Sequence, residues 1–183
     1  MAREFHYPIM PEIRERWSPR AFSTAPVARD DLMALLEAAR YAPSCMNEQP
    51  WRFLVADDEV RLEKMRRVLS EGNRVWAGRA PVLLLVLSVK PFADGSGENR
   101  WHLFDAGTAW GFLSLEAQRR GLYTHAMGGF SVRRAREEFG IPEELDVIAA
   151  VAVGWPGDVA ELSPGLQARE FPQERVELSE ILF

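Results

Sequence analysis

The sequence predicts a fold in which helices are layered on a central β-sheet, of either the α+β or the α/β class. Three patterns lead to this class: an amphipathic helix over residues 26–41, an unbroken β-branched and leucine-rich run over residues 81–89, and a largely apolar helical pattern over residues 103–120. Helices therefore lie between strands along the chain. With 183 residues, 47% of them apolar, we expect a single domain spanning residues 1–183.

The first half of the chain begins with the helix at residues 26–41, which has an acidic first turn and should end at Ala42-Pro43. Residues 51–55 alternate as a short strand, and residues 59–70 return to helical spacing. The run at 81–89 is apolar at almost every position. That pattern is typical of a central strand covered on both faces.

In the second half, residues 103–120 are apolar almost all round, which predicts a core helix with Gly121 as its natural C-terminal cap. A shorter helix is expected at residues 132–139 and a buried strand at residues 147–153. The tail, residues 158–183, departs from this rhythm, with two prolines, mixed charges and an apolar content confined to a terminal VELSEILF. It predicts either an arm that embraces a partner subunit or a frayed terminus.

Composition excludes several classes of protein. A net charge of -5 argues against non-specific binding to nucleic acid, which draws its affinity from a basic surface. The longest apolar run is about half the length of a membrane-spanning helix. Cys45 is the only cysteine, so one chain can form neither an internal disulfide nor a cysteine-based zinc site, and a reducing compartment, the cytoplasm, is expected.

Two polar clusters are candidates for a binding site. Residues 14–22 (RERWSPRAF) place Arg14, Arg16 and Arg20 close to Ser18, and guanidinium and hydroxyl groups suit a phosphate monoester. Taken alone, this segment is better explained as a solvated basic turn. Residues 43–53 (PSCMNEQPWRF) offer the hydroxyl and amides of a serine, an asparagine and a glutamine, which match the edge of a heterocycle or merely stabilise a turn.

Together these segments resemble the nitroreductase family of FMN enzymes. The first resembles that family's Arg-x-Ser-x-Arg-x-Phe signature, and the second its longer Pro-Ser-x-x-Asn-x-Gln-Pro-Trp-x-Phe signature. Further similarities follow in the same order: Ala80-Pro81, DAGTAWGFLSLEAQRRGLYT, Gly128-Gly129, Gly154-Trp155-Pro156 and an arginine near the end. The resemblance covers nearly the whole chain.

The resemblance implies an α+β three-layer sandwich with a central mixed β-sheet flanked by helices. It also implies a homodimer with non-covalent FMN at the subunit interface, embraced by the arm at residues 158–183. The implied activity is that of an oxidoreductase, in which hydride passes from NAD(P)H through the flavin to nitroaromatic, quinone or related conjugated acceptors by a ping-pong mechanism.

Site residues follow from the same resemblance. Arg16, Ser18 and Arg169 would hold the FMN phosphate, while Arg20 would lie near the flavin N1 and C2 carbonyl, where a fixed positive charge stabilises the reduced flavin. The complete expected cofactor-binding set is Arg16, Trp17, Ser18, Arg20, Pro43, Ser44, Asn47, Gln49, Met127, Gly128, Gly129 and Arg169. No catalytic side chain and no metal ligand are expected, since Cys45 and His125 are better explained as packed residues.

Three other functions are considered. A nicotinamide-binding Rossmann domain would use the Gly-Ser-Gly at residues 95–97, but Arg100 occupies the third glycine position, so the fingerprint fails. The chain would otherwise be a flavin-binding protein without turnover, or an interaction domain with a tryptophan-rich surface. Bound flavin together with bleaching by NAD(P)H distinguishes the enzyme from both.

Overall fold

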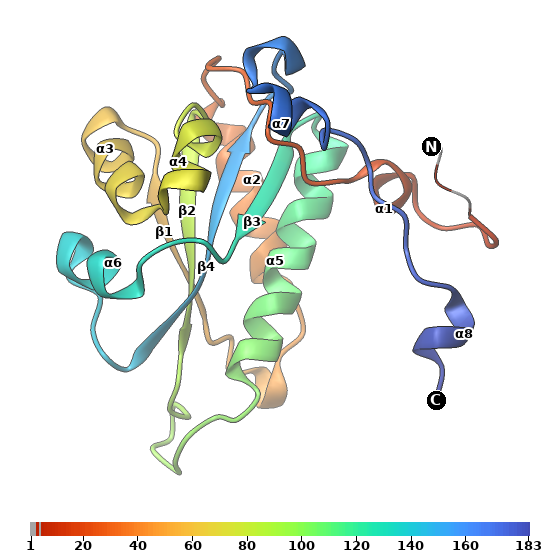
Figure 1. Cartoon of the computed structure of the whole chain (residues 1–183). Coiled ribbons are helices and arrows are strands. Elements are labelled where there is room, and N and C mark those ends of the chain that lie inside the picture. Colours follow the sequence, from red (N-terminus) through yellow and green to blue (C-terminus); the bar gives the residue numbers. More distant parts are fainter. Residues whose placement is uncertain (1–2, 4) are drawn as a thin grey trace.

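A four-stranded antiparallel sheet with helices on both faces forms the centre of the computed structural model, which describes residue 3 and residues 5–183 (Figure 1). The strand order is β1-β2-β4-β3, with β1 at Trp51–Ala56, β2 at Val82–Val89, β4 at Leu145–Gly154 and β3 at Tyr123–Met127. The expected α+β class and flanking helices are confirmed. The sheet of the described residues is not mixed as expected: β2 and β3 run in the same direction, but β4 lies between them in the opposite direction, so every neighbouring pair is antiparallel.

Helices cover the two faces of this sheet in separate groups. Helices α2 (Arg29–Arg40) and α5 (His102–Arg119) lie on one face, and α3 (Glu59–Val68), α4 (Glu71–Ala77) and α6 (Val132–Phe139) on the other. The remaining helical segments are α1 (Pro11–Glu15), α7 (Pro164–Gln167), α8 (Leu178–Ile181) and the 3-10 turns Cys45–Asn47 and Val159–Glu161. Among the described residues, no helix combines the length and the apolar character that a membrane span needs.

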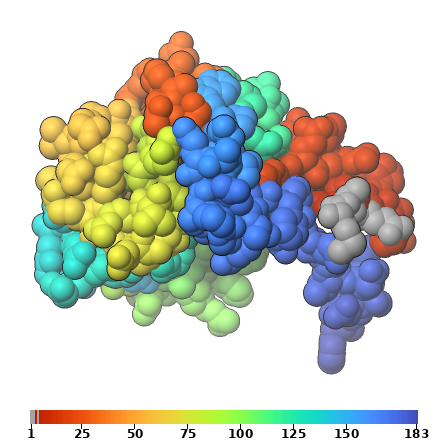
Figure 2. Space-filling model, turned by 45° about the horizontal axis from the view of Figure 1, so that its top comes forward, coloured from red at the N-terminus to blue at the C-terminus, as the bar shows by residue number. Residues whose placement is uncertain are grey.

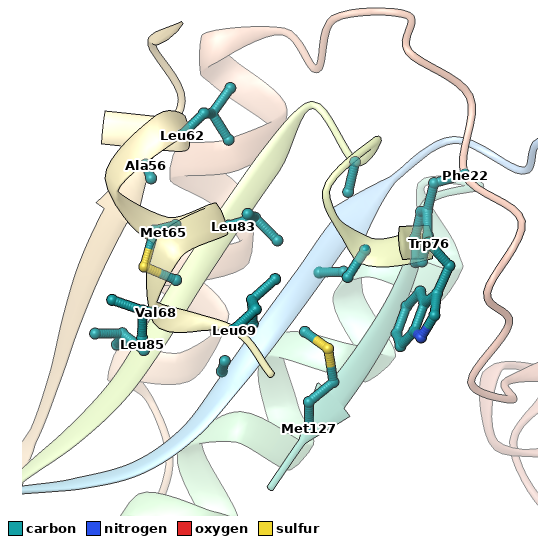
Figure 3. Close-up of a cluster of buried hydrophobic side chains, with 14 of the residues drawn as sticks. Phe22, Ala56, Leu62, Met65, Val68, Leu69, Trp76, Leu83, Leu85 and Met127 are labelled. Atoms are coloured by element: carbon teal, nitrogen blue, oxygen red, sulfur yellow. The ribbon is translucent and has the colours of Figure 1, made fainter. Parts of the chain in front are cut away.

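Strand β2 separates two hydrophobic cores, and seven of its eight residues are buried. Val82, Leu84 and Val86 face α2 and α5, while the alternating residues Leu83 and Leu85 meet side chains from α3 and α4. Figure 3 shows this second core, in which Met65 and Val68 of α3 lie over the strand. The sequence prediction of a central strand covered on both sides is therefore confirmed.

Helix α5 differs from the expectation of a core helix. Its buried face carries small residues and Leu113, but Leu103, Phe104 and Phe112 are 49%, 73% and 41% exposed. The isolated chain thus covers only one side of this apolar helix. Gly121, at a φ of 77°, adopts the left-handed conformation that ends the helix, as the sequence predicts.

The Rossmann alternative finds no support in this architecture. The Gly-Ser-Gly at residues 95–97 belongs to an exposed turn, closed by an isolated bridge between Pro91 and Glu98, and the sheet is antiparallel. A dinucleotide fingerprint instead needs a tight turn between a strand and a helix of a parallel sheet.

Both ends of the chain leave the sandwich on the same side. Figures 1 and 2 show residues 5–10 and the last part of the tail extending together from the body, with α8 at the tip of the tail. The Arg3 Nε donates to the carbonyl of Gln173 at 3.3 Å, which joins the two segments. In α8 and beyond it, Leu178, Ile181 and Leu182 are exposed.

Candidate functional site

A cavity of about 520 Å³ lies where the N-terminal segment meets the tail. Its walls hold five arginines that are scattered in sequence: Arg3, Arg16, Arg20, Arg169 and Arg175. Trp17, Ser18 and His125 complete the polar and aromatic lining, with Phe171 and Gln173. The first sequence motif and the tail are thus brought together around one strongly basic hollow.

Arg16 is the most informative of these side chains. Its Nη1 donates to the Ser18 Oγ at 3.3 Å, so guanidinium and hydroxyl stand together. Burial, followed by the positive charges of Arg3 and Arg175, lowers the pKa of Arg16. Within the part of the chain that the structure describes, Arg20 alone of the five arginines is in an ion pair. The cluster therefore carries uncompensated positive charge that can bind an anion.

Arg20 is anchored by Glu170, whose side chain is only 1% exposed. Glu170 Oε1 accepts from the backbone N–H of Arg20 at 2.6 Å and of Ala21 at 2.8 Å. The Arg20 Nη1 lies 3.8 Å from Glu170 Oε2. These contacts fix the segment after Ser18 against the tail.

His125, on β3, lines the cavity and supports the same segment. Its Nδ1 lies 2.8 Å from the carbonyl oxygen of Pro19, so the ring donates its proton there in the matching tautomer. The ring also packs on Trp76, with centroids 4.5 Å apart. Burial lowers the pKa of His125, and the charge of Arg20 acts in the same direction, whereas the Pro19 carbonyl and Glu170 oppose it.

The second sequence motif forms a separate loop between α2 and β1. Met46, Asn47 and Gln49 have positive φ values of 49°, 59° and 49°, so the loop is tightly coiled. Ser44 Oγ accepts from the Gln49 N–H at 3.0 Å, and the Cys45 N–H donates to the buried carboxylate of Asp105 on α5 at 3.0 Å. Part of the polar set predicted for the flavin edge thus stabilises the loop itself.

The glycine pair after β3 is explained in part by packing. A Cβ on Gly129 would stand 2.5 Å from the Asn73 Nδ2, and the Gly129 carbonyl accepts from that same amide at 2.9 Å. A Cβ on Gly128 would meet nothing within 4 Å. Met127 is buried in the core beside α4, as Figure 3 shows.

Of the predicted site residues, the structure gathers one group and leaves two apart. Arg16, Trp17, Ser18, Arg20 and Arg169 line the arginine cavity. None of the residues predicted from the second motif or from the glycine pair lines it: Pro43, Ser44, Asn47, Gln49, Met127, Gly128 and Gly129. The described residues contain no group of three His, Cys, Asp or Glu side chains that could hold a metal ion.

Sequence reasoning missed Arg3 and Arg175. Neither belongs to one of the two family signatures, and each is more than ten residues from Arg16, so local spacing carries no signal for them. Arg175 stands in the polar tail only six positions after Arg169. Treating every arginine of that tail as a candidate partner of the first motif would have found it.

Comparison with known proteins identifies the family. The model of the nitroreductase family matches residues 13–75 and 66–155. This chain belongs to the nitroreductase family. Its relatives in that family include a putative NADH dehydrogenase/NAD(P)H nitroreductase of Archaeoglobus fulgidus, 30% identical over 150 residues that cover 80% of this chain and 84% of the relative.

Two further proteins resemble this nitroreductase family member along most of its length. An enzyme of Bacillus subtilis named FMN reductase (NAD(P)H) is 25% identical in a match that covers 92% of this chain and 72% of the relative. A crystal structure described as an oxidoreductase containing FMN superposes with a TM-score of 0.94 at 39% identity, covering 99% of this chain and 93% of that one. The fold expected from the sequence resemblance is thereby confirmed.

Proposed function

We propose that this nitroreductase family member is an FMN-dependent oxidoreductase that takes hydride from NAD(P)H. The arginine cavity carries the proposal, because it joins the first family motif to the tail around a space of about 520 Å³. The names of the FMN-containing structure and of the FMN reductase relative support the same cofactor.

The cavity suits the phosphate of FMN chemically. A phosphate monoester carries a charge of about -1.5 to -2 near pH 7 and offers three acceptor oxygens. Arg16 and Ser18 supply a guanidinium and a hydroxyl side by side, and burial next to Arg3 and Arg175 makes the charged form of Arg16 less favourable without an anion. We assign phosphate binding to Arg16, Ser18 and Arg169, and add Arg3 and Arg175.

FMN, when bound, supplies the chemistry of accepting hydride from a nicotinamide and passing electrons to an oxidised acceptor. Arg20 is proposed to hold its positive charge beside the ring N1 and C2 carbonyl, while Trp17 forms the adjoining wall of the cavity. Gly128 leaves its backbone open on the side where a Cβ would meet nothing. That opening supports a close approach of the backbone from Met127 to Gly129 to the ring.

The remaining polar groups are proposed to come from a second subunit. Pro43, Ser44, Asn47 and Gln49 do not line the arginine cavity of their own chain, so we infer that they serve the flavin ring bound mainly by the partner. Three exposed features support dimerisation. They are the uncovered apolar residues of α5, two glycines on that helix at which a Cβ would meet nothing within 4 Å, and the exposed apolar residues of α8 and the position after it. In that order the residues are Leu103, Phe104 and Phe112, Gly107 and Gly111, and Leu178, Ile181 and Leu182.

In this proposal, residues 1–183 form one domain and residues 158–183 embrace the partner. The acceptors are nitroaromatics, quinones or related conjugated compounds, reduced in a ping-pong sequence in a reducing, cytoplasmic compartment. No essential nucleophile is needed, since hydride transfer requires orientation rather than a covalent step through a side chain.

The decisive experiment is spectroscopic. The purified protein should be yellow with non-covalent FMN, should bleach when NADH or NADPH is added without oxygen, and should regain colour with a quinone. A protein that stays colourless after incubation with FMN contradicts the cofactor assignment. Bound FMN that no nicotinamide bleaches would instead indicate a flavin carrier.

A further inference from the structure

Glu170 is a buried carboxylate that the proposed FMN contacts leave without a role. It follows Arg169 in the tail, and its side chain is 1% exposed. One oxygen accepts from two successive backbone donors, the N–H of Arg20 at 2.6 Å and that of Ala21 at 2.8 Å. Hydrogen bonds to a charged acceptor are among the strong ones, so this carboxylate fixes the Arg20 backbone against the tail.

The other oxygen of Glu170 faces the Arg20 side chain. It lies 3.8 Å from the Arg20 Nη1, and within the described residues it is buried without a hydrogen-bond partner. Arg20 itself reaches the cavity and also donates to the carbonyl of Arg169 at 3.4 Å. Since a buried carboxylate is costly unless it is paired, Arg20 is the partner that accounts for Glu170.

The pairing separates Arg20 from the other arginines of the cavity. Among the described residues, Arg3, Arg16, Arg169 and Arg175 have no carboxylate within 4.0 Å, so their charge is available to a phosphate dianion. Arg20 meets a fixed negative charge inside the protein instead. This ion pair, together with the hydrogen bonds to the tail, gives the Arg20 guanidinium a defined position and a partly compensated charge.

We infer that Glu170 is a positioning residue for the flavin: it holds Arg20 at the ring and moderates its positive charge, so that the tail sets the reduction potential of bound FMN. The inference rests on the proposed function, because it requires FMN in this cavity with its ring toward Arg20. Loss of the Glu170 charge leaves Arg20 uncompensated. The positive charge of Arg20 then stabilises the reduced, negatively charged cofactor more than the oxidised one, which raises the reduction potential.

The test compares Glu170→Gln, Glu170→Ala and a control in the same tail, Glu161→Gln. Glutamine keeps a carbonyl oxygen for the two backbone donors but removes the charge, whereas alanine removes both. Glu161 is an exposed partner of Arg79 at 2.7 Å, so its substitution removes a tail carboxylate away from the cavity. FMN affinity of the apo-protein and the midpoint potential of the bound cofactor are measured for each.

Glu170→Gln should still take up FMN, with the ratio of reduced to oxidised FMN affinity raised about tenfold, which is about 30 mV for a two-electron couple. Glu170→Ala should bind FMN more weakly as well, and the control should match the wild type. A wild-type protein that does not bind FMN overturns the proposed function and this inference together. Bound FMN whose potential is unchanged or lowered in Glu170→Gln overturns the inference alone.

A second pair of variants tests whether Glu170 acts on the flavin through Arg20. Arg20→Met is compared with the double variant that also carries Glu170→Gln. If Glu170 acts through Arg20, both proteins have the same midpoint potential, lower than that of the wild type. A difference between them would show that Glu170 acts by another route and would overturn the inference.

Discussion

Replacement of Arg16 by methionine should weaken FMN binding and leave the stability of the apo-protein nearly unchanged. Methionine keeps an apolar stem of similar length but removes the guanidinium. Among the described residues, that guanidinium donates only to Ser18, at 3.3 Å, and burial together with the charges of Arg3 and Arg175 lowers the pKa of Arg16. The charged form of Arg16 is thus less favourable in the folded than in the unfolded apo-protein, and its removal should leave the free energy of unfolding within about 0.5 kcal/mol.

The cost should appear in FMN binding. Loss of one charge-assisted contact to phosphate is worth about 1.5–3 kcal/mol, which raises the Kd of FMN about ten- to a hundred-fold. Urea unfolding of the apo-protein and fluorescence titration with FMN measure the two effects separately. If Arg16→Met destabilises the apo-protein by more than about 1 kcal/mol and leaves the Kd unchanged, Arg16 is a structural residue and the phosphate assignment is wrong.

Arg136 provides a matched control for this experiment. Its guanidinium donates to three backbone carbonyls between α6 and the start of β4, those of Ile141 at 3.1 Å, Pro142 at 2.5 Å and Leu145 at 2.6 Å. Arg136→Met should leave these acceptors without their donor and cost about 1–3 kcal/mol of stability. Its FMN affinity should equal that of the wild type.

Three further outcomes are expected. A leucine at position 111 finds open space within its own chain, so Gly111→Leu should stabilise α5 by nearly 1 kcal/mol. If α5 forms the dimer interface, the same substitution should weaken the dimer in sedimentation experiments. An unchanged dimer would refute that interface. Because the pKa of His125 is lowered in the folded protein, its neutral form contributes stability that is fully present above the ordinary pKa of about 6.5 and is lost as the pH falls below it. The free energy of unfolding of His125→Asn should therefore decrease less between pH 7 and pH 5 than that of the wild type. An equal decrease in the two proteins would contradict this. Cys45→Ala should keep kcat within about tenfold, and a loss of several orders of magnitude with FMN still bound would show that a thiol takes part.

The sequence predicts those elements whose pattern is local and strong. The helix at 132–139 is found at Val132–Phe139, and the run at 81–89 at Val82–Val89, because hydrophobic periodicity reports which face of an element is buried. Strand β3 and helix α4 were not predicted. Strand β3 is short and partly polar, and α4 contains a glycine and an asparagine. Neither therefore has a hydrophobic periodicity stronger than that of the flanking sequence.

For the site, the sequence alone determined the family signatures and a phosphate-suited segment at Arg16, Ser18 and Arg20. Only the tertiary structure decided which distant residues complete it, since packing between segments far apart in sequence brings Arg3 and Arg175 to Arg16. The apolar pattern of α5 likewise did not reveal that one side of the helix stays uncovered in the single chain. Periodicity records that a face avoids water, whereas the identity of the surface that covers it depends on contacts between segments far apart in sequence or in another chain.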